Sequence, residues 1–263
     1  MEYKVDKLIK KFENNELIYG THTFLGGGTI TEMYGKVGFD VVWIDGEHGY
    51  LDQKDVLNAL IGADTSDLVC FYRVPWNDPV LAKPILDMGV HGIIFPMVNT
   101  KEEAEKAVAA CRYPPVGVRG WAPRRASGYG TIPGPVYAEE ASKKVWCLTQ
   151  CESITAVHNL DEILQVEGLD GIIVGPCDLS ASMGLLPNTG HPEVKKVLDE
   201  IAQKCKAAHK LFCVSMGGAN EEVLTEWAKR GVSILFLNDE SNYLMEGATS
   251  TLNLLKKVSK SKV

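Results

Sequence analysis

Eight apolar runs, separated by stretches with helical spacing, constrain the fold of this chain more than any other feature. Runs of this length are typical of strands buried on both faces, as in a parallel sheet. The expected strands cover residues 18–23, 40–45, 68–74, 92–98, 145–150, 171–176, 211–216 and 233–238. Eight β-α units in about 250 residues match the size of a (β/α)8 barrel. An open doubly wound sheet is the alternative, but it usually has fewer strands, and no G-x-G-x-x-G turn follows the first strand here.

Local signals predict where several helices begin and end. Asp78 stands before a proline, which predicts an N-cap followed by proline at the first helical position. Thr100 begins a Thr-x-x-Glu capping box. Asn220 opens a helix that Gly231 closes. Pro84 lies deep within its helix and should bend it, because proline removes a backbone hydrogen bond.

Composition excludes several classes of protein. A formal net charge of −7 argues against a partner that is a nucleic acid or an anionic membrane. Seven cysteines, mostly within apolar runs, indicate reduced thiols in a cytoplasmic protein. No segment has the length of a membrane span, and the N-terminus lacks the apolar core of a signal peptide. We therefore expect one barrel domain over residues 1–263, with an N-terminal helix and a basic, solvated tail at about 256–263.

Two acidic residues follow two of the expected strands, 26 positions apart. Glu152 comes just after the strand at 145–150, and Asp178 just after the strand at 171–176. A helix-length stretch lies between these strands, so both carboxylates should reach the same rim of a parallel sheet, where such folds build active sites. Oxygen ligands suit a hard divalent cation. The long segment 112–137, rich in Pro, Gly and Arg, is expected to be an active-site loop.

Short motifs occur in order along most of the chain. They are Gly38-Phe-Asp40, Ile44-Asp45-Gly46-Glu47-His48, Arg73-Val-Pro-Trp-Asn-Asp78, Leu86-Asp87-Met-Gly89, Pro96-Met-Val98, Arg112-Tyr-Pro-Pro115-x-Gly117-x-Arg119-Gly120, Gln150-x-Glu152 and Gly175-Pro176-x-Asp178-Leu-Ser180. With these motifs, residues from about 20 to 247 resemble the HpcH/HpaI family of metal-dependent, class II pyruvate aldolases, which act on 2-keto-3-deoxy acids and related hydroxy-oxo acids. The resemblance implies a TIM barrel of the phosphoenolpyruvate/pyruvate type.

The resemblance also implies how the pyruvate half of a substrate is bound. Glu152 and Asp178 match the residues that hold a divalent metal, Mg²⁺, Mn²⁺ or Co²⁺, which would act as a Lewis acid. Arg73 matches the arginine that holds the keto oxygen and stabilises enolate charge, a role suited to a permanently charged, planar guanidinium. The backbone N–H groups that follow Gly175, those of Cys177 and Asp178, are expected to receive the substrate carboxylate.

A histidine completes the chemistry that the resemblance implies. His48 matches the acid–base residue, and imidazole is suited to moving a proton near neutral pH. Asp45 and Asp87 are both candidates to orient its ring, and the sequence does not choose between them. Glu47 is a candidate to support Arg73.

Three departures from the family pattern fall where the aldehyde half should bind. His22 stands where relatives usually carry tryptophan, which makes it a candidate substrate contact. The loop that contains Trp121, Arg124 and Arg125 keeps the Arg119-Gly120 of the family pattern at its start but diverges afterwards. Trp121 is a second candidate substrate contact. The three glycines at 26–28 make the first loop unusually flexible.

The sequence therefore predicts a lyase that reversibly cleaves a 4-hydroxy-2-oxo acid into pyruvate and an aldehyde. A decarboxylase or hydrolase acting on an oxaloacetate-like diacid, and a non-catalytic keto-acid-binding barrel, are the alternatives. The resemblance further implies a homo-oligomer, a hexamer built as a trimer of dimers, in which residues 244–255 of the last helix reach a neighbouring subunit.

Overall fold

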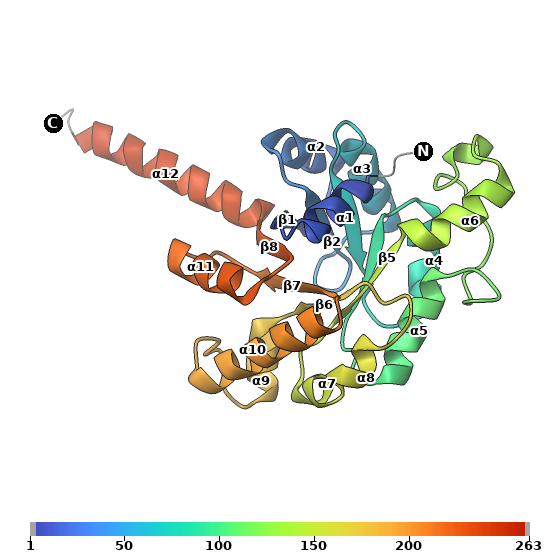
Figure 1. The fold of residues 1–263 in the computed structure, drawn as a ribbon. Coiled ribbons are helices and arrows are strands. Elements are labelled where there is room, and N and C mark those ends of the chain that lie inside the picture. Colours follow the sequence, from blue (N-terminus) through green and yellow to red (C-terminus); the bar gives the residue numbers. More distant parts are fainter. Residues whose placement is uncertain (1–3, 261–263) are drawn as a thin grey trace.

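Eight parallel strands close into a barrel in the order in which they occur in the chain, as the computed structural model of residues 4–260 shows (Figure 1). The strands are β1 (Ile18–Thr23), β2 (Val41–Asp45), β3 (Val69–Arg73), β4 (Gly92–Phe95), β5 (Trp146–Gln150), β6 (Gly171–Val174), β7 (Leu211–Met216) and β8 (Ile234–Asp239). The predicted (β/α)8 barrel is confirmed. The predicted strands begin and end within three residues of the observed ones, and the largest difference is at β4, which stops before Met97 because that residue takes a positive φ of 53°.

Helices form the outer ring of the barrel. They are α1 (Asp6–Glu13), α2 (Gly28–Val37), α3 (Gln53–Ala63), α4 (Pro79–Asp87), α5 (Lys101–Cys111), α6 (Gly134–Lys144), α7 (Ile154–His158), α8 (Leu160–Leu164), α9 (Pro176–Ser182), α10 (Pro192–Ala207), α11 (Glu221–Arg230) and α12 (Glu240–Lys260), with a 3₁₀ turn η1 (Gly128–Gly130). The three predicted N-caps are confirmed: the side chains of Asp78, Thr100 and Asn220 each accept a backbone N–H of the helix that follows.

One detail of the helical ring differs from the sequence-based expectation. The stretch between β5 and β6 forms two short helices, α7 and α8, which meet at Asn159, whose backbone is not helical. Pro84 does not interrupt α4, which runs on to Asp87.

Side chains alternate between two cores along each strand. In β2, Val41 and Trp43 point into the barrel, whereas Val42 and Ile44 pack against the outer helices. The same alternation holds in the other strands, because successive Cβ atoms of a strand point to opposite faces. The interior is closely filled: a Cβ added at Gly20 would lie 2.5 Å from the ring of Phe236.

The two ends of the barrel are different. At the N-terminal ends of the strands, Leu8 of α1 and Val5, the residue before this helix, close the interior. Both are fully buried in the same cluster as the barrel residues Ile18 and Val41. α1 does not cover the C-terminal ends of the strands, and barrel enzymes build their active sites at this end.

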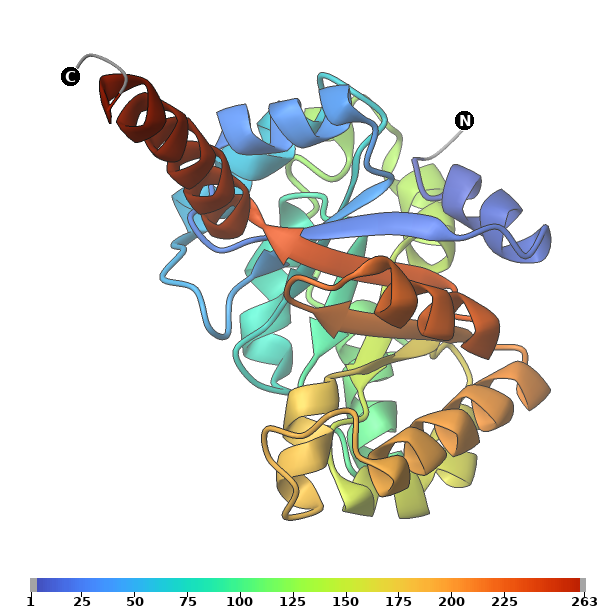
Figure 2. The same ribbon diagram turned by 90° about the vertical axis from the view of Figure 1, so that its left-hand side faces the viewer.

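The last helix leaves the barrel. α12 begins at the C-terminal end of β8 and projects outward past β1 and α2 (Figure 2). Residues 256–260, expected to be part of a solvated tail, are exposed but belong to this helix, and residues 261–263 lie outside the described part of the chain.

Candidate active site

The inward-facing positions at the C-terminal ends of the strands are polar. Trp43 and Phe71 point into the barrel. Asp45 and Arg73 lie two residues further along the same strands, so they also point inward, one layer above. Asp45 of β2 and Arg73 of β3 lie side by side in the register of these strands. Gln150 occupies the equivalent position above Leu148 on β5. All three polar side chains are buried, so each requires a partner.

Arg73 is the centre of this layer. Asp45 accepts hydrogen bonds from both Nε and Nη2 of Arg73, a bidentate ion pair. Nη1 lies 2.8 Å from Oε2 of Glu47 and donates to Oε1 of Gln150 at 3.2 Å. The guanidinium also stacks over the ring of Trp43, with 4.8 Å from its carbon to the ring centroid. The plane and direction of the guanidinium are therefore fixed before any ligand binds.

Glu152 is linked to Arg73 through Gln150. The Nε2 of Gln150 donates to Glu152 Oε2 at 2.8 Å, and the backbone N–H of Met97 donates to Oε1 at 2.8 Å. Burial raises the pKa of Glu152 to about 7; the Met97 hydrogen bond opposes the shift, and the nearby Asp178 carboxylate adds to it. A buried carboxylate beside a second carboxylate is electrostatically unfavourable, and a bound cation would relieve this repulsion.

Asp178 lies opposite Glu152 across Gly175. A Cβ added at Gly175 would lie 3.3 Å from Asp178 Oδ2 and 3.4 Å from Glu152 Oε2, so both oxygens face the same small space. Among residues 4–260, no group of three or more His, Cys, Asp and Glu side chains is placed to hold a metal. Two carboxylates fit Mg²⁺ or Mn²⁺, which commonly bind one or two protein carboxylates and complete their shell with substrate and water oxygens.

His48 lies on the bend after β2, at the edge of the site. Asp45 Oδ1 accepts the backbone N–H groups of Glu47, at 2.8 Å, and His48, at 3.0 Å, so Asp45 shapes the bend that carries the histidine. The His48 side chain is 66% exposed, and its Nε2 lies 3.9 Å from Glu47 Oε2. Asp45 thus positions His48 through the backbone. The carboxylate beside the His48 ring is that of Glu47.

Within one chain, the structure does not bring Asp87 or Trp121 to these residues. Asp87 is the last residue of α4, and it contacts Arg119, whose Nη2 lies 3.4 Å from Asp87 Oδ1. Trp121 packs against the rings of Tyr113 and Tyr137. Because α4 runs antiparallel to the strands, its C-terminal end lies toward the N-terminal rim of the barrel.

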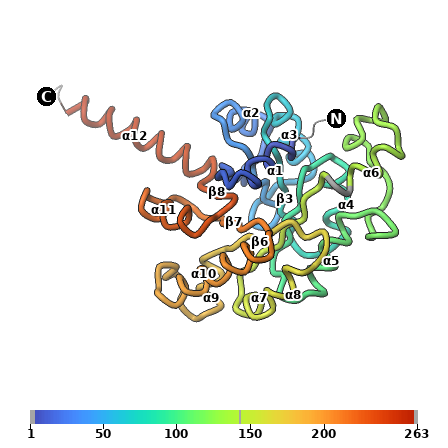
Figure 3. The backbone as a smooth tube through the Cα atoms, viewed as in Figure 1, coloured from blue at the N-terminus to red at the C-terminus, as the bar shows by residue number. Residues whose placement is uncertain are grey.

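The segment expected to be an active-site loop follows the same rim. Figure 3 traces it from α5 to α6 along the outside of the barrel. Arg125 donates to the carbonyl of Met88 at 2.7 Å and pairs with Asp64, so the C-terminal ends of α3 and α4 hold this segment in place.

His22 is inside the barrel rather than on the site surface. It is 5% exposed, and its ring nitrogens contact the Asn238 carbonyl, at 2.9 Å, and Ser215 Oγ, at 2.8 Å. Burial lowers the pKa of His22. A neutral ring with hydrogen on Nδ1 satisfies both contacts, since Nδ1 donates to the carbonyl and Nε2 accepts from the serine hydroxyl. Cys177, in contrast, is exposed in the first turn of α9, beside Asp178.

Two contributors to the site had no role in the sequence-based prediction. Gln150 bridges Arg73 and Glu152, and Met97 holds Glu152 through its backbone N–H. Gln150 could have been found from the sequence, because it continues the inward-facing positions Trp146 and Leu148 of its strand. Met97 acts through its main chain, which leaves no signal in residue type.

A closed parallel barrel with two carboxylates and a buried arginine at its C-terminal rim has the architecture of a barrel enzyme that acts on small, oxygen-rich substrates. The model of the HpcH/HpaI aldolase/citrate lyase family matches residues 25–237, and the chain belongs to this family. It is therefore an enzyme of the aldolase type.

Individual relatives agree with this assignment. The chain is 39% identical, over 76% of its length and 79% of the relative's, to a hydroxypyruvate/pyruvate aldolase of Roseobacter denitrificans. It is 41% identical, over 73% of its length and 74% of the relative's, to a 5-keto-4-deoxy-D-glucarate aldolase of Citrobacter koseri. The crystal structure of an HpcH/HpaI aldolase/citrate lyase family protein from Burkholderia cenocepacia superposes with a TM-score of 0.88 at 27% identity, covering 95% of this chain and 99% of that one.

No helix between residues 4 and 260 is both long and apolar enough to cross a bilayer.

Proposed function

We propose that this enzyme is a divalent-metal-dependent aldolase that reversibly cleaves a 4-hydroxy-2-oxo acid into pyruvate and an aldehyde. The observation that carries the proposal is the pair of carboxylates, Glu152 and Asp178, that face one space over Gly175. Gln150 connects the first of them, Glu152, to the Arg73 guanidinium. The names of the two curated relatives support a pyruvate-type substrate.

Glu152 and Asp178 are the residues that would hold the cation. When bound, Mg²⁺, Mn²⁺ or Co²⁺ supplies Lewis-acid polarisation of the keto group of the substrate. Gly175 leaves the space between the carboxylates open, since a side chain there would contact both. In the proposed arrangement, the backbone N–H groups of Cys177 and Asp178, in the first turn of α9, receive the substrate carboxylate.

Arg73 stabilises the negative charge that develops on the keto oxygen. Asp45 holds the Nε edge of the guanidinium, and Trp43 supports its face, so the edge that carries Nη1 is directed toward Gln150 and Glu47. A substrate oxygen at this edge would replace Gln150 or Glu47 as an acceptor of Nη1 while Asp45 keeps the guanidinium in place. A donor that needs no reorientation is the condition for effective stabilisation of a developing charge.

His48 moves the proton of the C4 hydroxyl. In the cleavage direction it accepts this proton, directly or through a water, as the C3–C4 bond breaks and the electron pair passes into the pyruvate enolate. The enolate is then protonated at C3. The exposure of the His48 ring at the rim supports a role at the aldehyde end, where a leaving product must reach solvent.

Product analysis tests the reaction class. Purified enzyme with Mg²⁺ or Mn²⁺ should release an aldehyde from a 4-hydroxy-2-oxo acid and form a new carbon–carbon bond from pyruvate and short aldehydes. Carbon dioxide release from oxaloacetate without any aldol activity would replace the proposal with the decarboxylase alternative.

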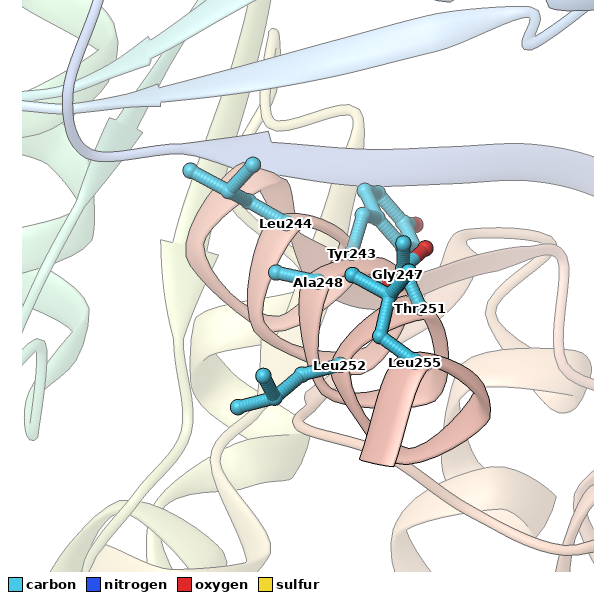
Figure 4. A pocket seen from close by; sticks show the side chains of 7 residues that line it. All are labelled: Tyr243, Leu244, Gly247, Ala248, Thr251, Leu252 and Leu255. Atoms are coloured by element: carbon cyan, nitrogen blue, oxygen red, sulfur yellow. The ribbon is translucent and has the colours of Figure 1, made fainter. Parts of the chain in front are cut away.

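We further propose that the enzyme is a homo-oligomer, a hexamer as a trimer of dimers, that acts on small molecules rather than on nucleic acid or a membrane. α12 supports self-association, because Leu244, Leu252 and Leu255 expose 65%, 50% and 61% of their surface and line an apolar groove on one side of the helix (Figure 4). A second copy of the chain would cover this surface. Light scattering should give a mass several times 28.8 kDa, and a monomer at assay concentration would contradict the proposal.

The predicted cytoplasmic location remains a proposal. Its support is that all seven cysteines are free, six of them buried.

A further inference from the structure

Glu240, the first residue of α12, has a buried carboxylate that binds the loop after β1. Its Oε1 accepts the Thr23 hydroxyl at 2.9 Å and the backbone N–H groups of Phe24, at 2.8 Å, and Leu25. Its Oε2 accepts the hydroxyl of Tyr34 at 3.3 Å. Glu240 is 8% exposed, so these partners replace the water that a carboxylate would otherwise keep.

The loop held by Glu240 packs against the loop that carries His48. A Cβ added at Gly49, the residue after His48, would lie 3.4 Å from the Phe24 carbonyl oxygen and 2.6 Å from that of Asp45. One added at Gly26 would lie 2.7 Å from the side chain of Leu51. The two loops therefore touch at Gly49 and Leu51, directly after His48.

We infer that Glu240 is a positioning residue for the acid–base end of the site. It fixes the β1–α2 loop, residues 24–27. The β2–α3 loop, residues 46–52, packs against this fixed loop, and the contact positions His48. The inference rests on the proposed function. Of residues 46–52, Glu47 pairs with Arg73, but Asp45 and Gln150 also hold the guanidinium. Gln150 and the backbone N–H of Met97 hold Glu152. Release of the loop should therefore affect mainly the aldehyde end of the site.

Two substitutions at Glu240 test whether its hydrogen bonds or its charge matter. The first removes the charge and keeps the hydrogen bonds, and the second removes both. Glu240→Gln keeps an oxygen that accepts the Phe24 and Leu25 N–H groups, and its amide can donate to the Tyr34 hydroxyl. Glu240→Ala leaves these groups without an acceptor, which should release the loop. Asn220→Ala serves as the matched control, because it removes the cap of α11, a side chain that accepts Val223 N–H and touches neither loop.

The test measures two activities and one structural signal on the full chain with Mn²⁺. The activities are methyl-proton exchange of pyruvate in D₂O and aldol addition of pyruvate to the short hydroxyaldehyde that the wild type uses best. The signal is amide hydrogen exchange of peptides that cover residues 24–27 and 46–52. Absence of both activities in the wild type would reject the proposed function, whereas the amide exchange still tests the contact between the loops.

Glu240→Ala should lower kcat of the aldol reaction by about 10- to 100-fold, the range expected when a catalytic group is displaced by roughly 1 Å. Pyruvate methyl exchange should stay within about twofold of the wild type, and amide exchange should rise in both loops. Glu240→Gln should restore both readouts, and Asn220→Ala should change neither. Equal losses of the two activities, unchanged exchange at 46–52, or failure of Glu240→Gln to rescue would each overturn the inference.

Discussion

Asp45 and Arg73 are neighbours in the barrel, on β2 and β3, and Asp45 binds the guanidinium through both of its oxygens while one of those oxygens also accepts the backbone N–H of His48. A single buried carboxylate thus orients the residue proposed to hold the enolate and shapes the bend that carries the residue proposed to move the proton. The two catalytic roles share one support.

Arg73→Ala should suppress aldol turnover and pyruvate methyl exchange together, because both pass through the same enolate. Removing one electrostatic stabiliser of this kind typically lowers kcat by about 10²–10³-fold. Arg73→Lys should rescue little, since an ammonium keeps the charge but cannot pair with Asp45 through two donors and reach Gln150 as well. Parallel assays of the two activities check this. Loss of only the aldol reaction would mean that Arg73 does not contact the enolate.

His48→Ala should lower the aldol reaction by about 10²–10⁴-fold, a typical contribution of a positioned acid–base group. Methyl exchange should fall less, because water can partly replace the histidine as the base at C3. Affinity for Mn²⁺, measured by calorimetric titration, should be unchanged, since His48 lies at the rim and contacts neither Glu152 nor Asp178 in the described interactions. If the substitution abolished Mn²⁺ binding, His48 would be a ligand and the two-carboxylate site would be incorrect.

The affinity for the cation should rise with pH through neutrality. Burial holds the pKa of Glu152 near 7, above its ordinary value of 4.5, so below this pH an incoming cation must displace a proton. The affinity should therefore fall by up to about tenfold between pH 7 and pH 6 and level off above about pH 8. The sign for stability is the reverse: the metal-free enzyme binds the proton more tightly when folded, so this group lowers the free energy of unfolding as pH rises from about 4.5 to 7.

Calorimetric titration with Mn²⁺ at several pH values measures this effect. Asp178→Asn, which weakens binding but leaves Glu152 in place, should retain part of the pH dependence, whereas Glu152→Gln should remove it. An affinity that is equal at about pH 6 and about pH 8 would show that Glu152 does not titrate on binding.

His22→Phe should reduce stability and leave the ranking of aldehydes unchanged. The substitution keeps an aromatic ring among Phe24, Trp43 and Phe236. It removes two hydrogen bonds, so the Asn238 carbonyl keeps the Thr21 hydroxyl at 3.2 Å and the Ser215 hydroxyl loses its acceptor. Loss of two such hydrogen bonds lowers the free energy of unfolding by about 1–3 kcal/mol. Urea unfolding and competition between aldehydes measure the two effects. A changed ranking at wild-type stability would restore the direct substrate contact that the sequence suggested.

The sequence was sufficient for the barrel because each strand repeats the same physical signal, an apolar run that must be buried on both faces. It was also sufficient for the residues that end those strands, since strand ends meet at one rim. Position along a strand even determines direction: Asp45 lies two residues after Trp43 and therefore points inward with it. The same parity applied to His22 would have placed its ring inside the barrel.

The loops could not be predicted in this way. Trp121 and Asp87 lie away from Arg73 and Glu152, in a region held together by contacts distant in sequence, such as Arg125 with Asp64 and Arg119 with Asp87. No local periodicity encodes such pairs. The connection of Glu240 to the β1–α2 loop is of the same kind, because its partners Thr23 and Phe24 lie more than 200 residues away in the chain.

If this enzyme forms a pyruvate enolate at Glu152 and Asp178 with the help of a divalent cation, proton NMR of pyruvate in D₂O should show it without knowledge of the aldehyde. Wild-type enzyme with Mg²⁺ should exchange the methyl protons for deuterium. Exchange should stop when the metal is removed by a chelator and resume when Mg²⁺, Mn²⁺ or Co²⁺ is added in excess, and Glu152→Gln should nearly abolish it. Exchange at the full wild-type rate after complete metal removal would contradict the account and redirect attention to a Schiff-base lysine.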